Sequence, residues 1–186
     1  MPKPKKPLFS GEFLLHNRYQ LATRSFFCGL MAISTKQELQ FLLHRSWEIE
    51  KKFESLSVWK GFVAVDSTYR ATVLTLARES HKHRLDLEQL LETLHLKSPT
   101  DEIPEATFDF EGMLDAEILQ RIIGHDKTVA DLYTELAEKT DPKLVAALSG
   151  VEDVDFFYKI LRQLVEDENR HVKMVNALTG IITRIQ

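Results

Sequence analysis

The sequence contains almost no cysteine. Cys28 is the single cysteine among 186 residues, so no disulfide can form within the chain. An iron site ligated by four cysteines is excluded for the same reason. Because disulfides are rare in reducing compartments, this composition leads us to expect a cytoplasmic protein, in which Cys28 is a small buried apolar residue.

Long apolar runs are also missing. The most apolar stretch, residues 25–33, is nine residues long, whereas a transmembrane helix needs about 20. We therefore expect no contact with a membrane. Residues 1–7 are basic but contain three prolines, and no clean apolar run follows them. This pattern predicts a flexible arm and not a secretory signal.

The chain has no excess of positive charge. Its formal net charge is -4, and no basic stripe follows the first six residues. This argues against a nucleic-acid partner. A composition of 44% hydrophobic and 28% charged residues is typical of a soluble globular protein, and the length fits one domain with a real core.

Glycine and proline are too few to interrupt most of the chain. Most of the seven glycines and six prolines lie near the ends or within residues 97–112. The uninterrupted segments predict an all-α protein, an antiparallel four-helix bundle with long helices at 35–60, 66–96, 113–139 and 152–185. Residues 97–112 carry two prolines and are predicted to cross the bundle from one end to the other.

Local signals mark several helix ends. Thr35 and Glu38 have the spacing of a capping box, and Gly61 is predicted to end the helix that they begin. Asp141 followed by proline predicts a short helix at 142–148, which Ser149 and Gly150 would end.

The domain organisation follows from these segments. Residues 1–34 are predicted to form an arm with a short helix at 19–32, and residues 35–186 the bundle. The short helix is interpreted as a lid over the bundle end, with an oligomerisation or partner surface as the alternative. We expect a homodimer.

Each long helix carries an ionisable group within its apolar stripe. Glu50 lies in the first stripe, His83 in the second with Glu79 one turn earlier, and Asp126 in the third. The last stripe consists of Phe157, Leu161, Leu164, Glu168, His171, Val175 and Leu178. A carboxylate and an imidazole in an apolar seam are unfavourable unless they are paired with each other or coordinate a metal ion.

Three stretches carry a resemblance to a known family. They are Ser46–Phe53, Asp126 with Tyr133 seven residues later, and Glu168-Asn-Arg-His171. With them, residues 35–178 resemble the ferritin-like superfamily, most closely rubrerythrin-like di-iron carboxylate proteins without the rubredoxin module. The resemblance implies two iron ions, with manganese or zinc as alternatives, and dioxygen or peroxide as the oxidant. It implies these ligands: Glu50, His83, Asp126, Glu168 and His171.

Two positions depart from the family pattern. Asp126 stands where the family usually has glutamate, and Ser80 stands where a Glu-x-x-His motif has its carboxylate. Glu79, four residues before His83, is predicted to replace that carboxylate because it lies on the same helix face. Glu54 is a further candidate. The function expected is an oxidoreductase acting on Fe(II). The alternative is a helical scaffold or binding protein with a degenerate metal site and no catalysis.

Overall fold

The computed structural model describes residues 32–54, 56–99 and 110–180, with side chains at 56–59 left out. These residues form an all-α protein, as predicted, and contain no β-sheet; Ile33 and Thr140 make an isolated bridge. The six helices are α2 (Lys36–Glu54), α3 (Leu56–Ala64), α4 (Ser67–Thr93), α5 (Asp115–Lys139), α6 (Pro142–Ser149) and α7 (Asp155–Leu178).

The contacts between Cα atoms divide the chain into two units, residues 1–32 and 33–186. All six helices belong to the second unit. The predicted arm and lid helix lie almost entirely outside the described residues, and the predicted domain boundary stays a prediction. Within the described part, no helix is both long enough and apolar enough to cross a membrane.

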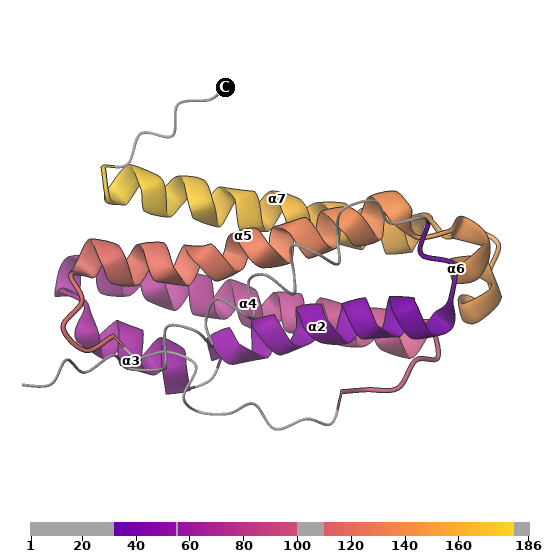
Figure 1. The fold of residues 1–186 in the computed structure, drawn as a ribbon, viewed down its shortest axis with the longest axis horizontal. Coiled ribbons are helices and arrows are strands. Elements are labelled where there is room, and N and C mark those ends of the chain that lie inside the picture. Colours follow the sequence, from indigo (N-terminus) through magenta and orange to yellow (C-terminus); the bar gives the residue numbers. More distant parts are fainter. Residues whose placement is uncertain (1–31, 55, 100–109, 181–186) are drawn as a thin grey trace, which may run out of the picture. The chain divides into compact units, whose positions relative to one another are not determined.

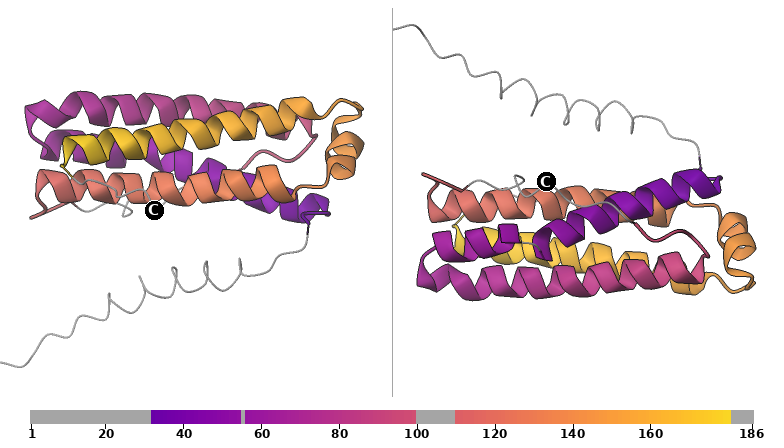
Figure 2. Two further views of the ribbon diagram at one scale, coloured as in Figure 1. Left: turned by 90° about the horizontal axis from the view of Figure 1, so that it is seen from above. Right: turned by 90° about the horizontal axis from the view of Figure 1, so that it is seen from below.

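Four long helices pack as two pairs. α2 packs against α4, and α5 packs against α7. The pairs meet where α2 contacts α5 and where α4 contacts α7. Figures 1 and 2 show the four helices running alongside one another. Every long helix therefore has a face that is covered by its neighbours.

Hydrogen bonds near the helix ends show that each pair is antiparallel. Nζ of Lys36, in the first turn of α2, donates to the backbone oxygen of His95, just after α4, at 3.2 Å. Nε2 of Gln120, near the start of α5, donates to Oγ1 of Thr179, just after α7, at 3.2 Å. In both pairs the start of one helix thus lies beside the end of the other.

The two pairs are joined so that α4 and α5 run in parallel. The backbone N–H of Asp66, just before α4, donates to Oδ2 of Asp115, the first residue of α5, at 3.3 Å. Figure 1 shows α4 ending at the opposite end from the start of α5. The connection predicted at 97–112 therefore begins and ends at opposite ends of the helices. Its residues 100–109 lie outside the described part.

The predicted helix ends depend on local hydrogen bonds, and most are confirmed. The backbone N–H of Glu38 donates to Oγ1 of Thr35 and that of Thr35 donates to Oε2 of Glu38, both at 3.2 Å, which completes the capping box. Asp141 accepts from the backbone N–H of Lys143 at 2.9 Å and begins α6. Gly150 ends α6 with φ 72°, a conformation that glycine adopts readily.

Two predicted boundaries are wrong. The segment expected to form one helix over 35–60 contains two. α2 ends at Glu54, and α3 begins at Leu56 and runs through Gly61 to Ala64. Gly61 therefore does not end a helix. A Cβ atom there would lie 3.3 Å from Cε2 of Phe110, so the glycine permits close packing. The last helix ends at Leu178, ahead of residues 181–186, which lie outside the described part.

The predicted stripes form the core of the second unit. Most of their apolar residues are less than 3% exposed, including Leu39 and Leu43 on α2, Leu119 on α5 and Phe157 on α7. Leu178 lies outside the core, since it is 43% exposed at the end of α7. Because the four buried faces meet, the ionisable groups within the stripes also meet. Those groups form the candidate functional site.

Candidate metal centre

Five ionisable side chains from four helices are buried together. Glu50 comes from α2, His83 from α4, Asp126 from α5, and Glu168 and His171 from α7. Each is at most 3% exposed. The sequence predicted all five, because each occupies a position on an apolar stripe. Among the described residues they make two groups of potential metal ligands.

The first group, the Glu50 group, consists of Glu50, His83 and Glu168. Nδ1 of His83 lies 2.7 Å from Oε1 of Glu168 and 3.4 Å from Oε1 of Glu50. The three potential ligand atoms all lie within 4.8 Å of one another. An ion held by one imidazole nitrogen and two carboxylates would have the mixed nitrogen and oxygen ligands that suit iron, manganese or zinc.

The second group, the Asp126 group, consists of Asp126, His171 and Glu168. Nδ1 of His171 lies 3.2 Å from Oε2 of Glu168 and 3.5 Å from Oδ2 of Asp126. Its composition therefore matches that of the Glu50 group, with one imidazole nitrogen and two carboxylates. Asp126 reaches this group although it stands where the resemblance led us to expect a glutamate.

Glu168 belongs to both groups and presents a different oxygen to each. Oε1 faces His83 and Oε2 faces His171. The two imidazole rings are stacked, with centroids 5.8 Å apart and an angle of 24° between their planes. A carboxylate that lies between two imidazoles in this way is suited to bridge two metal ions.

Several atoms of the two groups lack hydrogen-bond partners despite their burial. Among the described residues these atoms are Nδ1 and Nε2 of His83, Oδ2 of Asp126 and Oε1 of Glu168. Nδ1 of His83 is close to Oε1 of Glu168, yet the two atoms lack the geometry of a hydrogen bond. Buried polar atoms are nearly always satisfied in folded proteins. In the Asp126 group, Nδ1 of His171 does donate a hydrogen bond to Oε2 of Glu168, at 3.2 Å. Potential ligand atoms that converge without a hydrogen bond between them, such as Nδ1 of His83 and Oε1 of Glu168, fit a metal centre.

The outward-facing nitrogen of each imidazole lies next to another carboxylate. Nε2 of His171 is 2.5 Å from Oε2 of Glu79, and Nε2 of His83 is 3.5 Å from Oδ2 of Asp167. Arg170 links these two carboxylates, since it contacts Glu79 and also Oδ1 of Asp167, the latter at 2.8 Å. Metal-binding histidines commonly donate their second N–H to a carboxylate, which orients the ring.

The structure therefore puts Glu79 in a different place from the one expected. Its side chain is 29% exposed and belongs to neither group, whereas Ser80 is the buried residue of this turn at 4% exposed. A step of one residue turns a side chain by about 100° around a helix. Glu79 is thereby directed to the outer edge of His171. Glu54 also lies outside both groups and contacts His81 and Arg84.

Sequence reasoning missed Asp167 and Arg170. Asp167 is 3% exposed although it does not belong to the stripe of α7. The available signal was its position directly before Glu168, with Arg170 three residues later on the same helix face. Such a pair of charged residues is common on solvent-exposed helix faces. Asp167 is buried because α4 packs over it, and the sequence of α7 alone does not show this packing.

Tyr133 adds a hydrogen bond from within the core. Its hydroxyl donates to Oε1 of Glu50 at 2.6 Å, and the residue is fully buried. Burial, together with the charges of Glu50 and Glu168, raises the pKa of Tyr133 well above its ordinary value. The phenol therefore stays protonated and can continue to donate to Glu50.

The three carboxyl groups differ in acidity. Burial raises the pKa of Glu50 to about 7, against the opposing effect of His83. Burial similarly raises the pKa of Asp126 to about 6, against the effect of His171. Burial also opposes the charge of Glu168, but His171 and His83 outweigh it and lower the pKa. The shared carboxylate is consequently the most strongly ionised of the three.

The imidazoles hold their protons firmly when no metal is bound. Burial opposes the positive charge of His83, but Glu168 and Glu50 outweigh it and raise the pKa to about 10. Burial opposes that of His171 as well, and Asp126 and Glu168 raise its pKa to about 11. A metal ion binds neutral imidazole, so it would have to displace these protons.

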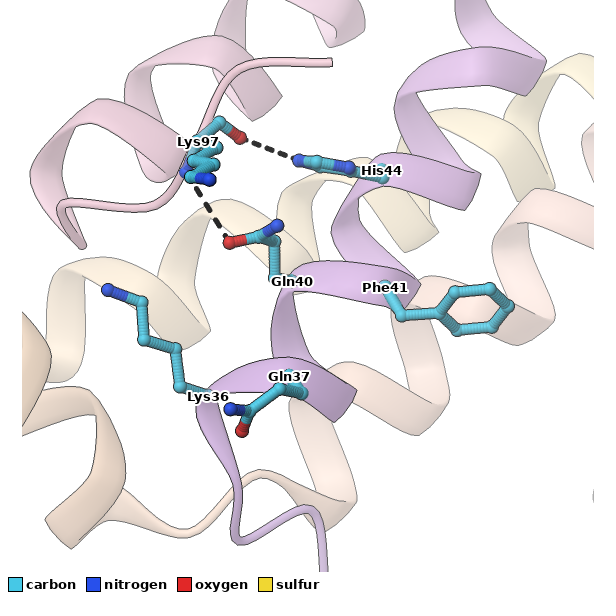
Figure 3. Close-up of a pocket in the computed structure, with 6 residues that line it drawn as sticks. All are labelled: Lys36, Gln37, Gln40, Phe41, His44 and Lys97. Carbon is cyan, nitrogen blue, oxygen red and sulfur yellow. Dashed lines mark hydrogen bonds between the residues drawn. The ribbon is translucent and has the colours of Figure 1, made fainter. Parts of the chain in front are cut away.

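A hollow on the surface, drawn in Figure 3, is separate from this centre. Nε2 of His44 donates to the backbone oxygen of Lys97 at 2.6 Å, and the backbone N–H of Lys97 donates to Oε1 of Gln40 at 3.5 Å (Figure 3). Its lining contains none of the residues of the two groups or of their outer partners and consists of Lys36, Gln37, Gln40, Phe41, His44 and Lys97.

Comparison with known proteins gives no match for this chain among family models, curated proteins or solved structures.

Proposed function

We propose that this protein is a ferritin-like metalloprotein that binds two iron or manganese ions between its four long helices. The observation that carries the proposal is the position of Glu168, which presents one oxygen to His83 and the other to His171. One ion would be held by the Glu50 group and the other by the Asp126 group. Zinc remains an alternative, because it takes the same ligand types.

The arrangement of the helices supports the ferritin-like assignment. Ferritin-like bundles consist of two helical hairpins joined by a long crossover, with metal ligands directed inward from all four helices. Here α2 and α4 are antiparallel, α5 and α7 are antiparallel, and α4 and α5 run in parallel. The cytoplasmic location and the homodimer expected from the sequence belong to the same proposal.

The residues around the two groups would keep the ligands in place. Glu79 and Asp167 would orient the two imidazoles, and Arg170 would hold both carboxylates. Tyr133 would fix the carboxylate of Glu50 through its hydroxyl. Because the ligands are at most 3% exposed, the surrounding core would exclude bulk water from the centre.

The proposed activity is that of an oxidoreductase. Ferrous ions bound at this centre would supply electrons for the reduction of dioxygen or peroxide. The chain itself would contribute carboxylates that balance positive charge and a hydroxyl, that of Tyr133, which can hold a proton next to Glu50. A centre whose ligands are at most 3% exposed favours small oxidants.

A second candidate function is a helical scaffold whose metal site has degenerated. The observation that favours it is that α4 brings Ser80, and no carboxylate, to the buried face one turn before His83. The raised pKa values of His83 and His171 would allow buried ion pairs with the carboxylates in place of a metal. Buried ion pairs can be tolerated without any functional role.

Metal analysis distinguishes the two candidates. Protein purified without chelator should contain about two equivalents of iron or manganese, and Glu168→Gln should lose both because it removes the shared charge while keeping the shape. The matched control is Glu166→Gln, at an exposed position of the same helix, which should keep its metal. Equal metal content in Glu168→Gln and the wild type would contradict the proposal.

A further inference from the structure

The two groups provide few donors for two ions. Each group has one imidazole nitrogen, one carboxylate of its own and one oxygen of Glu168. Iron and manganese ions in carboxylate sites take about six ligands. The nearby carboxylates of Glu79 and Asp167 already contact Arg170 and the outer edges of the imidazoles. Within the described residues, no further acidic group joins either set of ligands.

The protein groups also leave positive charge uncompensated. The three carboxylates of the two groups provide one negative charge fewer than two divalent ions require, and neutral imidazoles provide none. The outer charges do not correct this. Glu79 and Asp167 are matched by Arg170 and by Lys82, whose Nζ lies 4.0 Å from Oδ2 of Asp167. A net charge in a buried place is strongly unfavourable.

The missing carboxylate can be assigned to one helix. α2, α5 and α7 each direct a carboxylate to the centre, from Glu50, Asp126 and Glu168, whereas α4 directs only His83. On α4 the buried residue one turn before His83 is Ser80, at the same three-residue spacing that separates Glu168 from His171. A glutamate there would bring a carboxylate to the centre. The serine side chain ends at its hydroxyl.

We infer that a small oxyanion from solution binds beside Ser80 and completes the centre. It would supply the oxygen donors and the negative charge that α4 does not provide. A carboxylate or a similar anion with two oxygens on one atom has the required chemistry, because Glu168 uses the same geometry to face both imidazoles. This inference rests on the proposed metal function. Acetate is the probe.

The test is a calorimetric titration with Mn²⁺ in acetate and in chloride, at equal pH and ionic strength. In acetate the wild type should bind the second ion about tenfold more tightly, because the anion offsets a buried charge. Ser80→Glu should bind two ions with equal affinity in both salts. Ser80→Ala should keep the dependence on acetate, because it removes the hydroxyl and leaves the position open.

A matched control is Ala71→Glu, which adds the same charge at an exposed position of α4 and should behave as the wild type does. If the wild type binds two ions with the same affinity in acetate and chloride, the inference is wrong and the proposed metal function stands. If no ion binds in either salt, the proposed function is wrong as well. The wild-type comparison decides the matter even if Ser80→Glu does not fold.

Discussion

The two helical pairs contribute unequally to the centre. α5 and α7 together supply Asp126, Glu168 and His171, whereas α2 and α4 supply only Glu50 and His83. The imidazoles differ in a related way. Nε2 of His171 has a hydrogen-bond partner at 2.5 Å, and both nitrogens of His83 lack one. The α5–α7 pair therefore presents a better oriented half of the site.

This difference between the two halves predicts which half sets the affinity for the first metal ion and which half limits the reaction. A ligand that is held by a second carboxylate loses less conformational freedom when an ion binds. The half that contains His171 should therefore bind first and most tightly. The half that contains His83 should limit any reaction that needs both ions.

The largest effect is expected from removal of the imidazoles. His171→Ala should weaken binding of the tighter ion by more than about a hundredfold, because removing a metal ligand lowers the affinity more than removing an outer partner of a ligand does. His83→Ala should affect only the weaker ion. Calorimetric titration with Mn²⁺ measures both, and far-ultraviolet circular dichroism should stay helical. Equal loss of the tighter ion in the two variants would remove the distinction between the halves.

The next effect concerns the outer carboxylates. Glu79→Ala should lower the affinity for the tighter ion about tenfold and leave the number of bound ions unchanged. The substitution removes the hydrogen-bond partner of His171 but no metal ligand. Asp167→Asn should weaken binding of the other ion by less, because Oδ2 of Asp167 lies 3.5 Å from Nε2 of His83 without a hydrogen bond. A change in stoichiometry, determined by metal analysis, would show that Glu79 is a ligand, as the sequence first suggested.

Iron oxidation should reveal the weaker half. Wild-type protein should oxidise added Fe(II) in air slowly and with fewer than two irons per chain, because α4 brings no carboxylate to the centre. Ser80→Glu should increase the rate about tenfold by supplying one. Ferric absorbance in the near ultraviolet, followed with time, measures the reaction. Rapid oxidation of two irons by the wild type would mean that the halves are equivalent.

The smallest effect is the release of protons on metal binding. The pKa values of His83 and His171 are raised to about 10 and about 11, so both rings are charged at neutral pH without metal. Binding of two ions should release about two protons from the two imidazoles. Glu50, whose pKa is about 7, should release a further fraction of a proton. An indicator dye in weakly buffered solution measures the release. His171→Ala should release about one proton fewer.

The same pKa values set the direction of a pH effect on the metal-free protein. Both imidazole pKa values lie above the ordinary value of 6.5. The charged imidazoles therefore stabilise the fold fully below pH 6.5. This stabilisation should be lost as the pH rises through about 10 and 11. Thermal unfolding across this range should show a fall that is smaller in His83→Gln, which lacks one of the two groups.

The sequence by itself determined the helices and their inward faces. Capping at Thr35 and Asp141 and the periodic apolar stripes depend on residues three or four positions apart, which a single helix brings together. For the same reason the sequence located Glu50, Asp126 and Glu168 correctly on buried faces. It did not predict that α2 ends at Glu54 and that α3 begins at Leu56, because neither residue is a glycine or a proline.

Only the tertiary structure decided how the buried groups face one another. The sharing of Glu168 between His83 and His171, the outer position of Glu79 and the burial of Asp167 all join α4 to α7, about ninety residues away in the chain. Each depends on the packing and rotation of one helix against another, and a rotation of about 100° separates a ligand from an outer partner. No pattern within one helix records that rotation.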